Sequence, residues 1–144
     1  MAQSVRDIVH NLYSAFAAGD AAAALALLHP RVVWVEAENA PYADRNPYIG
    51  PEAVAEGVFA RLVGEWEGFT VTPDRIIESG DTVLALGRYR AVHRTTGLPL
   101  DAQFAHVWTV RDGSIVAFQQ YADTAQLVRV STRVPPPLVP SPMA

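Results

Sequence analysis

Hydrophobic residues in the first part of the chain recur at the spacing of amphipathic helices. Over residues 4–18 the apolar positions repeat every three or four residues, which predicts a helix with one buried stripe. Ser4 is placed to cap the start of this helix, and Gly19 is placed to end it. Asp20 then begins a second, alanine-rich helix, which we expect to run through Leu28.

A short strand and a third helix are predicted next. Residues 32–37 (VVWVEA) are β-branched and aromatic, which is typical of a strand. Alternation along this strand places Trp34 and Glu36 on one face, so that a carboxylate ends an otherwise apolar face. A polar loop over residues 38–49 follows, and Pro in a first turn indicates a helix over residues 50–64.

The second half of the chain changes to long strands separated by tight turns. The predicted strands cover residues 69–78, 82–94, 100–111 and 114–123. Because each connection has the chemistry of a hairpin turn, the four strands are expected to form an antiparallel meander. Three helices before such a meander indicate an α+β fold in which the helices cover one face of a curved sheet.

The composition and charge indicate how the chain is organised and which classes of partner it is expected to bind. The 144 residues, half of them hydrophobic, predict one domain over residues 1–130, and residues 131–144 form a proline-rich tail. The absence of cysteine excludes disulfides, thiolate metal sites and a cysteine nucleophile. A net charge of −4 without a Lys/Arg cluster argues against nucleic acid or a membrane surface as a partner. No signal-peptide pattern is visible, so a cytoplasmic location is expected.

Glu36 is the first candidate for chemistry. Burial beside Trp34 would disfavour its charged form and raise its pKa, as a general acid or base near neutrality requires. The alternative is that Glu36 lies at the exposed end of its strand and is solvated.

Two further candidates lie on the predicted strands. His106 faces the apolar side of its strand, where a neutral imidazole could donate to a ligand oxygen or relay a proton. Alternatively, it is a core histidine bound to a backbone carbonyl. Asp123 ends the last strand, on which Gln120 shares a face with Phe118, or else it caps a final helical turn that reaches Val130.

Motifs for common cofactors are absent from the sequence. It contains no phosphate-binding GxxxxGK[ST], no GxGxxG and no GxSxG. The four histidines have no HExxH spacing, so neither a metal site nor a cofactor is predicted.

The order of several short motifs resembles one known superfamily. These are Ala18-Gly19-Asp20, Leu27-Leu28-His29-Pro30, the strand ending at Glu36, Tyr48-Ile49-Gly50-Pro51-Glu52, and Arg111-Asp112-Gly113-Ser114-Ile115. Over about residues 4–130 this order is similar to the NTF2-like superfamily, in its ketosteroid isomerase and SnoaL-like polyketide cyclase branches. The resemblance implies a cone: a strongly curved, mixed but mostly antiparallel sheet around the helices, with an internal pocket. It also implies a homodimer.

The resemblance also implies roles for individual residues. The catalytic aspartate of the isomerases falls on Glu36, and their protonated oxyanion-hole aspartate falls on His106. Their oxyanion tyrosine falls on Leu12, one position from Tyr13, so that donor is missing at its usual place. The catalytic aspartate of the SnoaL-like branch falls on Asp123.

Together these expectations describe a cofactor-independent enzyme of isomerase, cyclase or lyase type. It would act on a small apolar carbonyl compound by proton transfer next to the carbonyl. The residues expected to bind this ligand are Tyr13, Phe16, Trp34, Tyr42, Tyr48, Phe59, Phe104, Trp108, Phe118 and Gln120. One alternative is a non-catalytic binding module in which Glu36 is ion-paired with Arg45 or Arg88. Another is a dimerisation domain that uses outward positions such as Val107 and Ala117.

Overall fold

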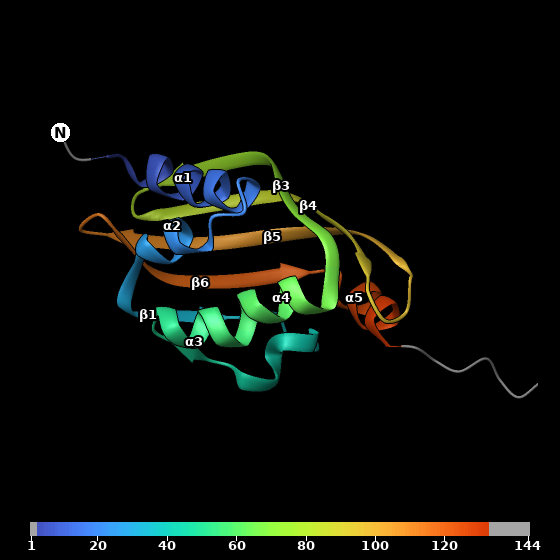
Figure 1. Ribbon diagram of the computed structural model, residues 1–144. Helices are drawn as coiled ribbons and strands as arrows, with labels where there is room; N and C mark the ends of the chain where they lie inside the picture. The colour runs from blue at the N-terminus through green and yellow to red at the C-terminus, as the bar shows by residue number, and fades with distance from the viewer. Residues whose placement is uncertain (1–2, 133–144) are drawn as a thin grey trace, which may run out of the picture.

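A curved sheet forms one layer of the structure, and most of the helices lie on its inner face (Figure 1). The computed structural model describes residues 3–132. In chain order the elements are α1 (Val5–Ala17), α2 (Ala21–Ala26), β1 (Leu28–Val35), the 3₁₀ helix η1 (Pro41–Arg45), β2 (Tyr48–Ile49), α3 (Pro51–Val54), the π-helical segment η2 (Ala55–Phe59), α4 (Ala60–Glu65), β3 (Trp66–Ser79), β4 (Thr82–His93), β5 (Pro99–Arg111), β6 (Ser114–Ala122) and α5 (Thr124–Ser131).

The sheet has six strands in the order β2-β1-β6-β5-β4-β3. Strands β3 to β6 form the predicted antiparallel meander. Strand β1 runs parallel to β6 and antiparallel to β2, which makes the sheet mixed. The expected α+β architecture with a strongly curved, mostly antiparallel sheet is therefore confirmed.

The predicted helix caps are present. The Ser4 hydroxyl accepts a hydrogen bond from the Asp7 amide at 3.1 Å, and the Asp20 carboxylate accepts one from the Ala23 amide at 3.0 Å. Gly19 between the two helices has φ +69°, a conformation in which a side chain would be strained. These local signals therefore fix where α1 ends and α2 begins.

The boundary between α2 and β1 differs from the prediction. Helix α2 ends at Ala26, and β1 already begins at Leu28, which pairs with Ile115 of β6. The pairing register shifts between Leu28 and Val33, which accommodates the intervening proline. At its other end β1 stops at Val35, so Glu36 lies just beyond the strand.

The third helix and the first long strand also differ in detail. Segments α3, η2 and α4 follow one another without a break over residues 51–65, with a π-helical turn in the middle. Strand β3 then begins at Trp66, three residues earlier than expected, and this residue is buried. Asp123 caps α5 at the other end of the chain, where its carboxylate accepts from the Gln126 amide at 3.1 Å. Residues 133–144 of the predicted proline-rich tail lie outside the described residues.

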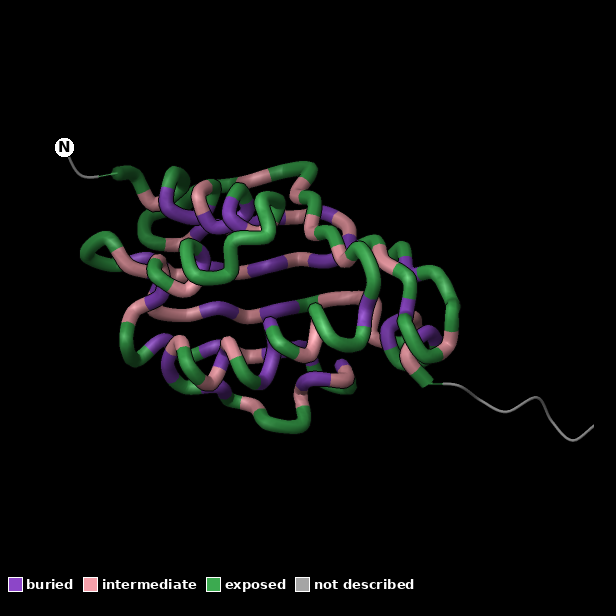
Figure 2. The backbone as a smooth tube through the Cα atoms, viewed as in Figure 1, coloured by how far each residue is buried: buried purple, intermediate pink, exposed green. Residues whose placement is uncertain are grey.

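The core fills the space between the inner face of the sheet and the helices. Along β4 and β5 buried residues alternate with more exposed ones, as Figure 2 shows for the central strands. A second cluster includes Trp66, Tyr89 and Leu100, and it is covered by Leu127 and Val130 of α5. Within residues 3–132 none of the helices combines the length and the apolar character that a bilayer crossing requires.

Gly87 of β4 lies where β3 bends closely over it, and this contact gives a first prediction. A Cβ at Gly87 would lie 2.1 Å from the Thr72 carbonyl oxygen and 2.7 Å from the Pro73 Cα. Because both are backbone atoms, we expect Gly87→Ala to lower the free energy of unfolding by about 1–3 kcal/mol. Urea denaturation measures this change.

The matched control is Gly64→Ala in α4, where a Cβ would meet nothing within 4 Å. Alanine favours a helix, so this variant should be as stable as the wild type or more stable by about 0.5–1 kcal/mol. Equal stability of the Gly87→Ala variant and the wild type would contradict the close approach of β3.

Candidate functional site

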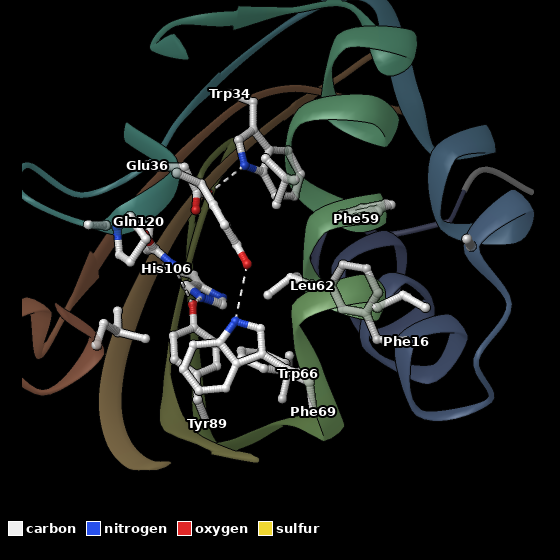
Figure 3. A pocket seen from close by; sticks show the side chains of 18 of the residues that line it. Phe16, Trp34, Glu36, Phe59, Leu62, Trp66, Phe69, Tyr89, His106 and Gln120 are labelled. Carbon is white, nitrogen blue, oxygen red and sulfur yellow. Dashed lines mark hydrogen bonds between the residues drawn. The ribbon is translucent and has the colours of Figure 1, made fainter. Parts of the chain in front are cut away.

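An aromatic cavity of about 310 Å³ lies between the inner face of the sheet and the helices. Figure 3 shows the sheet side of this cavity, with Glu36, Gln120, His106 and Tyr89, and the helical side, with Phe16, Phe59 and Leu62. Nine of the predicted site residues line it: Phe16, Trp34, Glu36, Tyr42, Phe59, His106, Trp108, Phe118 and Gln120.

Glu36 lines the cavity and is buried, with 4% of its surface exposed. Its backbone is held by Asn46, whose side-chain oxygen accepts from the Glu36 amide at 2.9 Å. The Asn46 side-chain nitrogen donates to the Glu36 carbonyl at 2.8 Å. The carboxyl group accepts one hydrogen bond, from Trp34 Nε1 at 2.8 Å. A solvated position at a strand end is thus contradicted by the burial.

The environment of Glu36 changes its proton affinity. Burial raises the pKa of this carboxyl to about 7, and the hydrogen bond from Trp34 and the charge of Arg61 offset only part of the effect. Arg61 itself is bound to Asp44 at 2.9 and 3.0 Å. Near neutral pH the group is therefore shared between its charged and neutral forms, as acid–base chemistry requires.

The ion pairs suggested for a binding module do not form in the described part of the chain. Arg88 donates to Asp101 at 2.7 Å on the outer face of the sheet. Within residues 3–132 no arginine forms a salt bridge with Glu36.

His106 lies between two tyrosine hydroxyls. Its Nδ1 is 2.6 Å from the Tyr13 hydroxyl, and its Nε2 is 2.5 Å from the Tyr89 hydroxyl. Its partners are therefore tyrosines and not the backbone carbonyl suggested as the alternative. Burial lowers the pKa of His106 to about 3, so the ring is neutral near pH 7.

The hydrogen bonds continue on both sides of His106. Trp108 Nε1 donates to the Tyr13 hydroxyl at 2.8 Å, and Gln120 Nε2 donates to the Tyr89 hydroxyl at 2.9 Å. The Gln120 side-chain oxygen accepts from the Ala37 amide at 3.0 Å. A continuous chain of hydrogen bonds thus crosses the inner face of the sheet to the segment that follows β1.

Some of the predicted ligand contacts lie behind the cavity wall. Tyr13 is 4% exposed and does not line the cavity; its hydroxyl is bound to His106. Phe104 stacks on His106 with ring centroids 3.9 Å apart and lies over Gly87. Leu12, at the position of the isomerase tyrosine, is a fully buried core residue. These side chains support the site without facing it.

Two other predicted site residues also lie outside the cavity. The Tyr48 ring packs closely against Gly57 of η2, and its hydroxyl donates to the Tyr42 carbonyl. Asp123 caps α5 and does not line the cavity, which agrees with the capping alternative. Neither side chain is placed to touch a ligand in this cavity.

Three aromatic residues that the sequence did not mark line the cavity: Trp66, Phe69 and Tyr89. Trp66 was missed because the strand was expected to start at Phe69. Alternation along β4 does place Tyr89 on the inner face, but its contact with His106 depends on how β4 and β5 are aligned. Trp66 Nε1 donates to the Tyr42 hydroxyl at 3.1 Å, and that hydroxyl donates to Glu65 at 2.7 Å.

The cavity combines one carboxyl group of raised pKa with a hydrogen-bonded set of aromatic side chains. This arrangement can hold an apolar ligand and move a proton to or from it. In the described range 3–132, no three His, Cys, Asp or Glu side chains are grouped so that they could hold a metal ion.

Comparisons with known proteins identify a family and several solved structures that are similar to this chain. The family model described as SnoaL-like domain matches residues 9–118. An NTF2-like protein from Burkholderia thailandensis E264 is 34% identical with a TM-score of 0.86, and the match covers 91% of this chain and 99% of that one. A search of the curated proteins found no match.

Two further solved structures are similar. TerC, co-crystallised with polyporic acid, is 25% identical with a TM-score of 0.79, over 89% of this chain and 98% of that one. IdmH from Streptomyces antibioticus, a proposed polyketide cyclase, is 23% identical with a TM-score of 0.73, over 88% and 97%, and shows the fold alone. With the family model matching more than half of its length, the chain belongs to the SnoaL-like domain family and has the NTF2-like fold.

Proposed function

We propose that this protein is a cofactor-independent enzyme of isomerase, cyclase or lyase type that moves a proton next to a carbonyl group of a small apolar ligand. The observation that carries the proposal is the Glu36 carboxyl, buried in an aromatic cavity with a pKa raised to about 7. A carboxylate with this proton affinity is a much stronger base than one in water, and it remains partly ionised at neutral pH.

The proposed reaction transfers a negative charge from Glu36 to the ligand within the cavity. When the Glu36 carboxylate takes a proton from the carbon beside the carbonyl, the C–H electron pair becomes the enolate double bond and the carbonyl electrons move onto oxygen. The net charge in the cavity is −1 before and after this step. Because burial already disfavours the carboxylate, transfer of its charge to the ligand adds no further charge to the apolar site.

The size of the cavity and the ligands of related proteins support a small molecule. A volume of about 310 Å³ lies at the lower end of the range for ligand pockets. TerC was crystallised with polyporic acid, and a protein with the ketosteroid isomerase-like fold from Catenulispora acidiphila was crystallised with trimethylamine. The homodimer that the resemblance implies stays a prediction.

The first test is the titration of Glu36. A ¹³C NMR titration of the side-chain carboxyl should give a midpoint near pH 7 instead of the ordinary 4.5. The folded state then holds a proton that the unfolded chain has released, so the stability supplied by this group falls between about pH 4.5 and pH 7. The loss is on the order of 3 kcal/mol, and urea unfolding at pH 5 and pH 8 measures it.

Glu36→Gln removes the titrating group and should remove this part of the pH dependence. The variant should therefore gain stability relative to the wild type as the pH rises. A Glu36 midpoint at or below its ordinary value would contradict the proposed role and favour a non-catalytic binding module.

The second test measures the chemistry with 2-acetylnaphthalene, a flat apolar ketone with exchangeable protons beside its carbonyl. We expect the protein to speed the exchange of these protons in D₂O, followed by ¹H NMR. Glu36→Gln should reduce the catalysed rate by about 10²–10⁴-fold, because the amide cannot accept the proton.

Glu38→Gln is the matched control, because Glu38 lies two residues further along the chain and is exposed. Its exchange rate should equal that of the wild type. If Glu36→Gln exchanged protons as fast as Glu38→Gln, the assignment of Glu36 as the base would be wrong.

A further inference from the structure

The directions of the hydrogen bonds around His106 follow from two groups that can only donate. The indole N–H of Trp108 donates to the Tyr13 hydroxyl, so that oxygen already accepts one hydrogen bond. The backbone N–H of Ala37 donates to the Gln120 side-chain oxygen, which fixes the orientation of the amide. The Gln120 NH₂ group therefore donates to the Tyr89 hydroxyl, and that oxygen also accepts one hydrogen bond.

The neutral His106 ring carries one N–H, and its position decides which tyrosine has a proton left over. If Nδ1 carries the hydrogen, it donates to Tyr13, whose oxygen then accepts two hydrogen bonds and whose own proton has no acceptor. In the described part of the chain the Tyr13 hydroxyl has no partner besides His106 and Trp108, and it does not line the cavity. An unsatisfied buried donor of this kind costs about 1–3 kcal/mol.

The other tautomer avoids this cost. With the hydrogen on Nε2, Tyr13 donates to Nδ1, and Nε2 donates to the Tyr89 oxygen. The Tyr89 oxygen then accepts from both His106 and Gln120, and its own proton is free. Tyr89 lines the cavity, whereas Tyr13 does not.

We propose that His106 is held in the Nε2–H tautomer and that the Tyr89 hydroxyl is the donor that binds an oxygen atom of the ligand. The inference rests on the proposed function for the identity of the reacting group, and it names the residue that faces the ligand oxygen. Tyr89 is then the catalytic residue on the oxygen side, and His106 is a positioning residue that acts through Tyr89.

The other hydroxyl and ring N–H groups of the cavity wall are already engaged. In the described residues Tyr42 donates to Glu65 and accepts from Trp66, and Trp34 donates to Glu36. Among these groups, only Tyr89 keeps an unused proton within residues 3–132. A ligand oxygen that contacts this wall of the cavity therefore accepts its hydrogen bond from the Tyr89 hydroxyl.

The position and strength of this donor suit an enolate oxygen. Figure 3 shows Tyr89 and Glu36 on the same side of the cavity. Burial, and to a lesser extent the charge of Glu36, raises the pKa of Tyr89 well above its ordinary value, so the hydroxyl keeps its proton. A hydroxyl that accepts two hydrogen bonds is also a better donor, because both partners stabilise negative charge on its oxygen. When Glu36 takes the proton from carbon, the electron pair moves onto the ligand oxygen, and Tyr89 keeps its proton and strengthens its hydrogen bond.

The tautomer can be measured without a ligand. A ¹H–¹⁵N correlation spectrum of the histidine side chains distinguishes a protonated Nε2 from a protonated Nδ1. The His106 ring is recognised because it should not titrate between about pH 5 and pH 8. We expect the Nε2–H pattern for this ring, and the Nδ1–H pattern would overturn the proposal.

The donor can be measured with two probes that differ only in the oxygen. 2-Acetylnaphthalene carries a carbonyl that can accept a hydrogen bond, and 2-ethylnaphthalene has a similar shape without it. We expect Tyr89→Phe to weaken binding of the ketone by about 2- to 10-fold in a fluorescence titration. Binding of the hydrocarbon should stay within about 2-fold, because the phenylalanine ring keeps the cavity wall.

The hydrocarbon also serves as the control for folding. If Tyr89→Phe weakened both probes equally, the hydroxyl would be structural and the proposal would be wrong.

These measurements are independent of the role of Glu36, because they need no turnover. If Glu36→Gln kept full exchange activity while Tyr89→Phe lost affinity for the ketone, the proposed base would be wrong and the proposed donor correct. If Glu36→Gln lost exchange activity while Tyr89→Phe kept its affinity for the ketone, the proposed base would be correct and the proposed donor wrong.

Discussion

Every polar side chain on the inner face of the sheet must find its hydrogen-bond partner within an aromatic interior. This constraint sets the proton affinities of the site. Burial raises the pKa of Glu36, because the hydrogen bond from Trp34 and the charge of Arg61 offset only part of its effect, and burial keeps His106 neutral. Among the described residues no buried side-chain nitrogen or oxygen is left without a partner. The chemistry of the cavity therefore follows from how a few polar groups share their hydrogen bonds.

The mixed topology of the sheet brings these groups together. Because β1 lies parallel to β6, the segment that follows β1 runs beside Gln120. That contact joins Glu36, at the end of β1, to the hydrogen-bonded chain on β4 and β5. Further along the chain, η1 is linked to α4 by the ion pair between Asp44 and Arg61. Asn46 then holds the backbone of Glu36 from the loop side. The backbone of residues 36 and 37 is thus held by Asn46 and by Gln120, which lie far from each other in the sequence.

Much of the fold could be predicted from short-range signals. The helix caps at Ser4 and Asp20, the meander and the inward face of His106 all depend on residues close together in the sequence, and the structure contains them. The errors lie at boundaries that distant strands decide. Strand β1 begins at Leu28 because β6 is there to pair with it, and β3 begins at Trp66, where it pairs with His93 of β4. The strand propensity of a segment does not show which distant strand it will pair with, so it does not predict where the strand begins.

For the site, the pattern of residues along the strands was enough to predict that a carboxylate follows an apolar strand and that a histidine faces the core. Alternation is a local property, so it fixes which face a residue lies on. Which of these groups meet depends on how distant segments pack together. Tyr13 and Tyr89 lie 93 and 17 residues from His106, yet their hydroxyls contact its two nitrogens, while Asp123 caps a helix instead. The register of β4 on β5 and the packing of α1 on the sheet place these atoms within hydrogen-bond distance, and neither arrangement can be read from spacing along one strand.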